Sequence, residues 1–466
     1  MTAHHDLSAI ELVAAYRTRA LSPVEVTRAV LDQIAAWEPQ LNATYALDAD
    51  AAMQAARASE QRWQRGEPQG PLDGVPAMIK ENIATRGTPM PLGTAATVLA
   101  PAERDAPPAA RMREAGAVIL GKTTMPDYGM LSSGLSSFHP LTRNPWDLSR
   151  GPGGSSAGAG AGVAAGYGPL HLGTDIGGSV RLPASWCGVF ALKPSLGRIP
   201  IDPPYAGRVA GPMTRTVADA ALMMGVLAHA DDRDTTSLPA EAIAWLQLDR
   251  DVRGLRIGLL LDAGCGLPVD AEVAAAVQAA ADRFAAAGAH VELVAPFFTR
   301  AMLDGMDAFW RMRSWLDWSA LPAARQAQVL PFIVRWLKGG AALSGEQVFR
   351  GYSQMAAMRD AAVAAHRPFD AVLSPTAPIA AFAAELASPT DDAERPLEHI
   401  AFTVPYNMSE QPAASIGCGF TSAGLPIGLQ IAGKRHCDLL VLQLARAWEQ
   451  MRPLPRPWPE PPSTTT

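Results

Sequence analysis

The fold class of this chain follows from three neighbouring segments, RIGLLLD (256–262), DAEVAAAVQAAADRFAAAG (270–288) and HVELVA (290–295). The first and third segments are short apolar runs, which are typical of buried strands. The middle segment repeats its apolar residues with a helical period and ends at Gly288, a residue type that commonly terminates helices. A strand, a helix and a second strand in this order indicate a parallel sheet, so we predict an α/β protein.

Further predicted elements extend this unit in both directions. Three more strands are predicted nearer the carboxyl end: FDAVLSP (369–375), AASIGCGF (413–420) and PIGLQIAG (426–433). Residues 439–451 are predicted to form a final helix. Residues 1–70 are predicted to be helical, because Ser22 and Glu25 have the spacing of a capping box and precede apolar residues with a helical period.

The composition is that of an ordinary globular protein. The chain has 466 residues, of which 48% are hydrophobic and 18% charged, and its formal net charge is −6. This mildly acidic balance argues against a dedicated nucleic-acid-binding protein, which would normally carry a basic face. The four cysteines are far apart, and we find neither a signal peptide nor a membrane-spanning segment, so we expect buried thiols and a cytoplasmic location.

Residues 71–200 are rich in Gly, Ser and Pro and contain two familiar motifs. GAVILGKT (116–123) matches the phosphate-binding pattern GxxxxGK[ST], but its four central residues are apolar and a proline interrupts the helix that should follow. A strand that ends in a turn is therefore favoured there. GSSAG (154–158) matches GxSxG with Ser156 as nucleophile, but prolines break the strand that such a nucleophile requires before it.

A third pattern combines a lysine with glycine-serine segments. Lys80 lies between apolar residues in PLDGVPAMIKEN (71–82), and desolvation would lower its pKa, which is the condition for a lysine to act as a base. IGGS (176–179) offers successive backbone amides that can stabilise an oxyanion beside a serine nucleophile. Each feature also has a plain structural interpretation, since a lone lysine is usually a surface charge and a Gly-Gly pair is usually a tight turn.

Three longer segments contain or follow these motifs and extend the pattern. They are GKTTMPDYGMLSSGLSSFHPLTRNPWDLSRGPGGSSAGAGAGVAAG (121–166), HLGTDIGGSVRLPASWCGVFALKPSLGRIP (171–200) and GFTSAGLPIGLQIAGK (419–434). Together with PLDGVPAMIKEN, they closely resemble the amidase signature family from about residue 71 to residue 434. The resemblance implies a single large α/β domain with a central mixed β-sheet covered by helices on both faces.

The resemblance also implies how the chain is organised. We expect one amidase signature domain over residues 1–466. Its expected parts are a helical N-terminal segment (1–70), a catalytic core (71–230), a helical substrate-entrance subregion (300–365) and a disordered Pro-rich tail (452–466).

By resemblance, the site is a Ser–cis-Ser–Lys triad. Ser179 corresponds to the nucleophile, Ser155 to a bridging serine after a cis peptide bond, and Lys80 to the base. The implied oxyanion hole consists of the amides of Ile176, Gly177, Gly178 and Ser179. The implied supporting residues are Gly154, Thr174, Asp175 and Arg181, of which Asp175 and Arg181 form a charge pair. Neither a metal nor a cofactor is expected.

Substrate choice is expected to depend on less typical parts of the chain. Residues 124–127 depart from the usual family sequence beside the acyl pocket. Candidate pocket residues are Met130, Trp310, Trp315, Trp318, Phe332 and Trp336. No motif places a basic residue to receive a substrate carboxylate. The expected substrate is therefore a small-molecule amide with a bulky neutral or aromatic group.

The predicted function is hydrolysis of a carbon–nitrogen amide bond through an acyl-serine intermediate. The expected partners are a small amide and water, with no nucleic acid and no membrane, and a homodimer is left open. Two alternatives use the same machinery. One is a carbamate or ester hydrolase, and the other is the subunit of a glutamine-dependent amidotransferase that releases ammonia for a partner.

Overall fold

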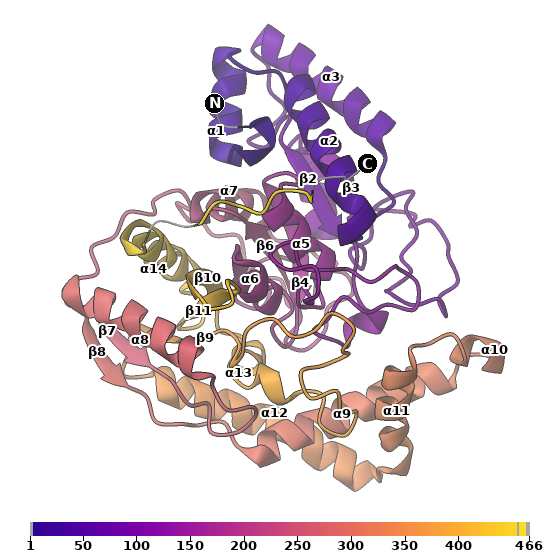
Figure 1. Ribbon diagram of the computed structural model, residues 1–466, viewed down its shortest axis with the longest axis vertical. Helices are drawn as coiled ribbons and strands as arrows, with labels where there is room; N and C mark the ends of the chain where they lie inside the picture. The colour runs from indigo at the N-terminus through magenta and orange to yellow at the C-terminus, as the bar shows by residue number, and fades with distance from the viewer. Residues whose placement is uncertain (1–2, 454–455, 463–466) are drawn as a thin grey trace.

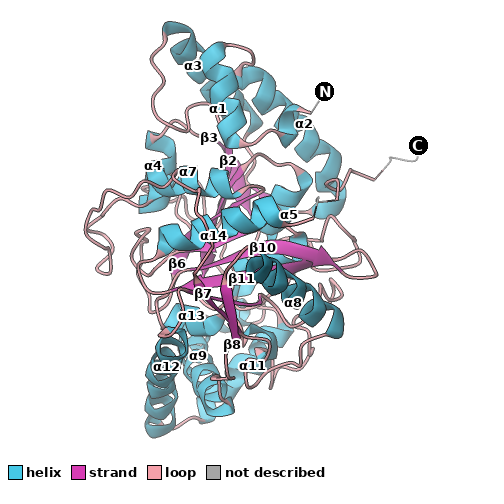
Figure 2. Cartoon of the chain, turned by 90° about the vertical axis from the view of Figure 1, so that its left-hand side faces the viewer, coloured by secondary structure: helices cyan, strands magenta, loops and turns pink. Residues whose placement is uncertain are grey.

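A mixed β-sheet runs through the centre of the protein, and helices cover both of its faces (Figures 1 and 2). The computed structural model describes residues 3–453 and 456–462, and within them the sheet has eleven strands in the order β1-β3-β2-β4-β6-β5-β10-β11-β9-β7-β8. The strands are β1 (Thr44–Tyr45), β2 (Pro76–Lys80), β3 (Val118–Thr123), β4 (Leu170–Asp175), β5 (Phe190–Lys193), β6 (Val209–Thr214), β7 (Arg256–Leu259), β8 (His290–Leu293), β9 (Ala371–Pro375), β10 (Ala413–Phe420) and β11 (Pro426–Gly433).

Parallel pairs lie towards the two ends of this order and antiparallel pairs lie between them, except that β1 is antiparallel to β3 at one end. β2 is parallel to β3 and β4, and β7 is parallel to β8 and β9. β7, helix α8 (Ala271–Ala286) and β8 form the predicted strand–helix–strand unit. The structure confirms the predicted α/β fold with a central mixed sheet.

The helices cluster at the two ends of the molecule and along the sheet (Figure 1). Besides α8, they are α1 (Ala9–Thr18), α2 (Pro23–Leu41), α3 (Ala49–Arg65), α4 (Pro107–Glu114), α5 (Ala157–Ala165), α6 (Arg181–Cys187), α7 (Val217–Leu227), α9 (Arg300–Ser319), α10 (Ala323–Gln326), α11 (Pro331–Lys338), α12 (Gly345–His366), α13 (Val404–Met408) and α14 (Asp438–Met451). Helices α1 to α3 lie at one end, and α9 to α12 lie at the other. Helix α2 begins with the predicted capping box of Ser22 and Glu25.

The N-terminal segment contains one element that its helical pattern did not predict. β1 is a two-residue strand between α2 and α3, and it pairs antiparallel with β3. Two residues are too few to show a period, so the pattern of apolar residues could not reveal this strand.

Two clusters of buried hydrophobic residues hold the molecule together. The larger includes Trp37 of α2 and Trp448 of α14 and packs on the sheet. The second includes Trp310 of α9 and Trp336 of α11, under the helices opposite the N-terminus. Across the described residues, 3–453 and 456–462, no helix combines the length and the apolar character needed to cross a membrane.

Both motifs that the sequence analysis set aside have structural roles. The apolar residues of GAVILGKT form β3, and Lys122 on this strand is buried with its Nζ donating to Ile83 O and, at 2.6 Å, to Thr85 Oγ1. Ser156 precedes α5, and its Oγ donates to the carbonyl oxygen of Thr174 at 3.2 Å. These side chains therefore satisfy buried backbone groups, which is the ordinary role of polar residues in a core.

Part of the C-terminal tail packs against the protein. Within residues 452–466, residues 454–455 and 463–466 lie outside the described part. In the described part, the ring of Trp458 lies under Arg215, with the guanidinium carbon 4.5 Å from the ring centroid. This tryptophan gives the described part of the Pro-rich segment an aromatic contact with the surface.

Candidate active site

Two neighbouring parallel strands place the predicted residues at one edge of the sheet. β2 ends at Lys80 and β4 ends at Asp175, with Ile79 paired to Leu172. The carboxyl ends of parallel strands meet at the same edge, which is the usual place for a binding site in an α/β sheet. The segment 176–180 leaves β4, carries Ser179 and leads into α6.

Lys80 is completely buried and contacts two hydroxyl groups. Its Nζ donates hydrogen bonds to Ser155 Oγ at 2.8 Å and to Thr174 Oγ1 at 3.1 Å. Burial and, to a smaller extent, the charge of Arg208 lower the pKa of Lys80 to about 7. Both influences disfavour the ammonium form, so a large fraction of this lysine is neutral near pH 7 and can accept a proton.

Asn82 also belongs to this group, although no motif argument had pointed to it. Its Nδ2 donates to Thr174 Oγ1 at 3.1 Å, so Thr174 joins the amide of Asn82 to the amine of Lys80. Thr174 had been expected only as a supporting residue. Its side chain contacts Lys80 directly.

Ser155 lies beside the lysine, just before α5. The Gly154–Ser155 peptide bond is cis. Gly154 is packed so closely that a Cβ atom there would lie 2.6 Å from the carbonyl oxygen of Leu131, so only glycine fits. The backbone N–H of Ser156 donates to the carbonyl oxygen of Ser179 at 3.1 Å, which joins this turn to the segment that carries Ser179.

Asp175 shapes that segment. Its carboxylate accepts hydrogen bonds from the backbone N–H groups of Gly178 at 2.8 Å and Val180 at 3.2 Å. Gly178 has a φ of 125°, in a region that L side chains rarely adopt. The carboxylate therefore holds the chain on both sides of Ser179.

The backbone N–H groups of the expected oxyanion hole differ in whether they already have a hydrogen-bond acceptor. The N–H of Gly178 is engaged by Asp175. The N–H groups of Ile176, Gly177 and Ser179 donate to no acceptor within the described residues. These three amides are the members of the expected set that can bind another oxygen atom.

Arg181 completes a buried network behind Ser179. Its Nε and Nη2 atoms each donate to the Asp175 carboxylate at 3.0 Å, and both side chains are fully buried. Its Nη2 also donates to Asn407 Oδ1 at 2.6 Å and its Nη1 to Gln430 Oε1 at 2.8 Å. Burial alone would raise the pKa of Asp175, but the charge and hydrogen bonds of Arg181 outweigh it and hold that pKa well below its ordinary value.

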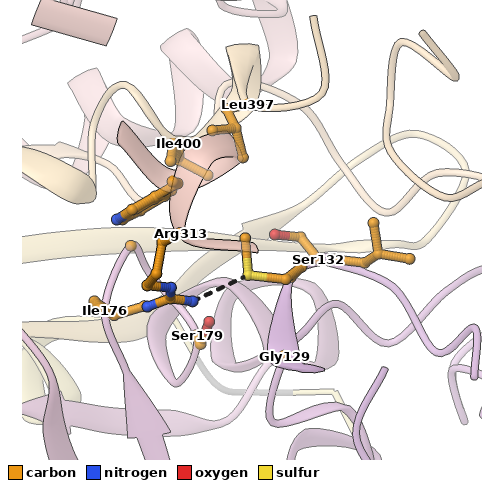
Figure 3. Close-up of a pocket in the computed structure, with 11 residues that line it drawn as sticks. Gly129, Ser132, Ile176, Ser179, Arg313, Leu397 and Ile400 are labelled. Atoms are coloured by element: carbon orange, nitrogen blue, oxygen red, sulfur yellow. Dashed lines mark hydrogen bonds between the residues drawn. The ribbon is translucent and has the colours of Figure 1, made fainter. Parts of the chain in front are cut away.

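Two cavities meet at Ser179. The smaller includes Leu397 and Ile400 in its lining (Figure 3), and Trp310 lines it as well. The larger has a volume of about 1380 Å³ and includes Ser155 in its lining. The residues that line both cavities are Gly129, Met130, Ile176, Ser179 and Arg313. A substrate can therefore lie across Ser179 with one part in each cavity.

The structure separates the candidate pocket residues into two groups. Met130, Trp310 and Trp318 line one or both cavities. Trp315, Phe332 and Trp336 are not among the lining residues of these cavities. Instead, the ring of Trp315 lies 5.4 Å from that of Trp318, and Phe332 and Trp336 are buried in the second hydrophobic cluster.

The buried histidines near the site are engaged in other contacts. His139 Nε2 lies 2.6 Å from Glu81 Oε2, and His171 Nε2 lies 3.3 Å from the carbonyl oxygen of Tyr167. Burial lowers the pKa of His171 to about 3, so this ring is neutral. No group of three or more His, Cys, Asp or Glu side chains within the described residues is arranged to hold a metal ion.

Comparison with known proteins agrees with this architecture. The sequence profile of the Amidase family matches residues 25–442. The chain is 35% identical to an acylamidase of Rhodococcus erythropolis over 96% of each protein. It is 33% identical to a glutamyl-tRNA(Gln) amidotransferase subunit of Chloroflexus aggregans over 97% of each. The crystal structure of a bacterial aryl acylamidase of the amidase signature family superposes with a TM-score of 0.87 and is 32% identical over 96% of each chain.

The chain belongs to the amidase signature family. It is an amidohydrolase that acts on carbon–nitrogen amide bonds. The family resemblance and the type of reaction inferred from the sequence are thereby confirmed.

Proposed function

We propose that Lys80, Ser155 and Ser179 form the catalytic triad of this amidase. The observation that carries the proposal is the 2.8 Å contact between the buried amine of Lys80 and Ser155 Oγ. The low pKa of Lys80 supports it, because a base must be neutral before it can accept a proton. Ser155 and Ser179 line the same cavity, and no hydrogen bond joins their hydroxyl groups within the described residues, so the transfer between them requires a closer approach when an amide binds.

The cycle uses these side chains in both directions. Neutral Lys80 accepts the proton of Ser155, Ser155 accepts that of Ser179, and Ser179 Oγ attacks the carbonyl carbon of the amide. The proton returns through Ser155 to the nitrogen of the leaving amine, the carbon–nitrogen bond breaks and an acyl ester remains on Ser179. Water then repeats the route and releases the acid.

Backbone N–H groups stabilise the oxyanion that forms during both attacks by donating hydrogen bonds to it. We assign this role to the amides of Ile176, Gly177 and Ser179, which have no acceptor within the described residues. Gly178, which the family resemblance included in the set, has a positioning role, because its N–H holds Asp175.

The smaller cavity supports a substrate with an aromatic or bulky apolar group. It is lined by apolar side chains that include Leu131, Trp310 and Ile400. The similarity to an acylamidase and to an aryl acylamidase supports the same class of substrate. Catalysis is thus assigned to the core at 71–230 and substrate admission to the helices at 300–365.

Mass spectrometry of the acyl intermediate tests the triad and the substrate together. The protein is incubated with a panel of aryl amides, quenched and digested with trypsin. The tryptic peptide 151–181 contains Ser155, Ser156 and Ser179, so fragment ions must locate the added acyl mass. We expect it on Ser179. An adduct on Ser156 or Ser155 would refute the proposed nucleophile.

A role as an amidotransferase component is the second candidate, and the 33% identity to the Chloroflexus aggregans protein favours testing it. Such a component would hydrolyse glutamine slowly by itself and faster in the presence of its partner. Rapid hydrolysis of aryl amides by the isolated chain would exclude this as the main role. Ester and carbamate analogues of the best amide, measured beside it, rank the leaving groups that the acyl-serine chemistry accepts.

We also propose a cytoplasmic location, with a small amide and water as the partners of the reaction. All four cysteines are free thiols in the structure, which suits a reducing compartment. Cell fractionation followed by an activity assay tests the location, and activity confined to a secreted or membrane fraction would contradict it.

A further inference from the structure

Two arginines in the larger cavity have almost no hydrogen-bond partners. Arg208 precedes β6, and Arg313 lies on α9, opposite the strand ends that carry the triad. A guanidinium group has five N–H donors. Within the described residues, the side-chain hydrogen bonds of this pair are one from Arg208 Nη1 to Pro203 O at 3.1 Å and one from Arg313 Nη2 to Met130 Sδ at 3.7 Å (Figure 3).

Tyr205 contacts both residues, Arg313 through its side chain and Arg208 through the backbone. The guanidinium carbon of Arg313 lies 4.9 Å from the centroid of the Tyr205 ring, and the backbone N–H of Arg208 donates to Tyr205 O at 2.9 Å. Tyr205 Oη and Arg313 Nε are buried and have no hydrogen-bond partner within the described residues. We call these three residues the arginine–tyrosine cluster, and all three line the cavity that Ser155 and Ser179 also line.

The carboxylates of the same cavity form no ion pair with the cluster within the described residues. Asp175 is paired with Arg181, and Asp202 is paired with Arg104 at 3.1 Å. Asp317 lines the cavity and is exposed, and within the described residues neither it nor Asp202 forms an ion pair with a member of the cluster.

Another arginine on α9 has its charge compensated by carboxylates. Arg311, two positions before Arg313, forms ion pairs with Asp307 at 2.6 Å and with Glu394 at 3.1 Å. By contrast, burial and the charge of Arg313 lower the pKa of Arg208, whereas Asp202 raises it. Two neighbouring cations without a counter-ion are unfavourable in a partly buried cavity, unless a bound anion offsets them.

We propose that the arginine–tyrosine cluster binds a carboxylate of the substrate, so that the amide cleaved at Ser179 carries a negative charge on the part held in the larger cavity. This inference rests on the proposed function and adds a charge to the aromatic or apolar amide named there. A carboxylate is planar and accepts two parallel hydrogen bonds from a guanidinium group, and its remaining lone pairs can accept from a tyrosine hydroxyl. The cluster supplies these donors.

The sequence could not assign this specificity. Tyr205, Arg208 and Arg313 lie outside the segments that resemble the family, and more than a hundred residues separate Arg313 from the other two. Only the fold brings α9 over the segment that precedes β6. The expectation of a neutral amide had depended on finding no basic residue within a motif.

Matched pairs of anilides test the proposal on the wild-type enzyme. The first pair places the charge on the amine part: a benzoyl amide of para-aminobenzoate and the same amide of para-aminoacetophenone. The second pair places it on the acyl part: succinyl anilide and levulinoyl anilide. Each neutral member replaces the carboxylate by a methyl ketone of similar size. We expect kcat/KM for the charged member to exceed that of its neutral partner by about tenfold or more in one pair, with a smaller excess at high salt.

Substitutions then connect this preference to the cluster. Arg313→Gln and Arg208→Gln are each expected to lower the ratio of charged to neutral kcat/KM by about 10- to 100-fold, the size of a lost charge-assisted hydrogen bond. Tyr205→Phe removes one hydroxyl and is expected to lower the ratio about three- to tenfold. Arg350→Gln is the matched control, because it removes an exposed arginine paired with Glu346 on α12 and leaves the ratio unchanged.

Wild-type ratios near one in both pairs, or ratios that Arg313→Gln and Arg208→Gln leave unchanged, overturn the proposal. A binding measurement covers the case in which these amides turn over slowly. Benzoate is expected to raise the Tm of the wild type more than acetophenone does, and Arg313→Lys and Tyr205→Phe are expected to reduce that difference. Equal shifts would overturn the inference. Hydrolysis of both members of each pair with charged-to-neutral ratios of kcat/KM near one would contradict this inference and leave the proposed function intact. Binding of benzoate without hydrolysis of any amide would contradict only the proposed function.

Discussion

The two sides of the active-site cleft are built on different principles. One side, which we call the catalytic floor, consists of the ends of β2 and β4 with Lys80, Ser155 and Asp175, whose side chains are hydrogen-bonded. The other side, the substrate wall, consists of α9 and residues 202–208, where several donors have no partner within the described residues. The comparison indicates that hydrogen bonds hold Lys80, Ser155 and Asp175 in place, while the unpaired donors of the wall are available to a ligand.

The largest effect is expected from removing the proposed nucleophile beside the floor. Ser179→Ala eliminates the atom that we propose becomes acylated and should lower kcat by about 10⁴-fold or more. Ser156→Ala is the matched control, because this neighbouring buried serine donates to the backbone of Thr174 and is given no catalytic role. Steady-state kinetics with an aryl amide measure both. Retained turnover in Ser179→Ala, or its loss in a folded Ser156→Ala, would reverse the assignment.

The next effect concerns the rigidity of the floor. Asp175→Asn leaves the buried guanidinium of Arg181 without its counter-ion and is expected to lower the free energy of unfolding by about 3–5 kcal/mol. Chemical denaturation measures the loss. The exposed pair of Arg350 and Glu346 serves as the comparison, since Arg350→Gln should change the same quantity by less than about 1 kcal/mol. Equal effects of the two substitutions would show that burial does not distinguish these pairs.

The pH dependence of the rate tests the state of the base. Because the proposed base Lys80 must be neutral to accept a proton and its pKa is lowered to about 7, kcat/KM should rise with pH through that value. At pH 5 it should be about 100-fold below its alkaline plateau, since about one lysine in a hundred is then neutral.

Lys122 provides the control for this profile, because burial lowers its pKa to about 7 as well. Lys122 donates to Ile83 O and Thr85 and does not contact Ser155. The midpoint should therefore persist in Lys122→Met. Loss of the midpoint in Lys122→Met would show that the titrating group is Lys122 and not Lys80. A rate that is constant from about pH 5 to 9 would contradict a lysine base.

The smallest effect is expected on the apolar part of the wall. Trp310→Ala enlarges the smaller cavity and should raise KM for an aryl amide about tenfold, with a smaller change in kcat. Trp315→Ala is the control, since Trp315 lies on the same helix and packs beside Trp318. Kinetics with two amides of different acyl size measure the change. Equal effects of the two substitutions would mean that the cavity does not select the substrate.

The elements that could be predicted from the sequence are those with a local signal. The strands β10 and β11 have the predicted bounds 413–420 and 426–433, because each is a continuous apolar run between turn residues. Helix α2 begins with the predicted capping box of Ser22 and Glu25 for the same kind of reason. β1 lacks such a signal, since its stability comes from pairing with β3.

Within the site too, some residues could be predicted from the sequence and others could not. The three triad residues were named from segments of sequence that resemble a family. Gly178 was grouped with the oxyanion amides, because spacing cannot show that Asp175 takes its N–H. Asn407 and Gln430, which hold Arg181, are separated from it by more than two hundred residues, and only the packing of α13 and β11 brings them together.

The position of Ser179 at the junction of two cavities has a consequence for the second half of the reaction. In the proposed cycle, the departure of the amine empties the cavity that held it, while the acyl fragment on Ser179 stays in the other cavity. An incoming molecule then reaches the ester carbon along the path by which the amine left. A nucleophile with affinity for the emptied cavity competes there with solvent, so added amines should divert the fragment into new amides rather than free acid.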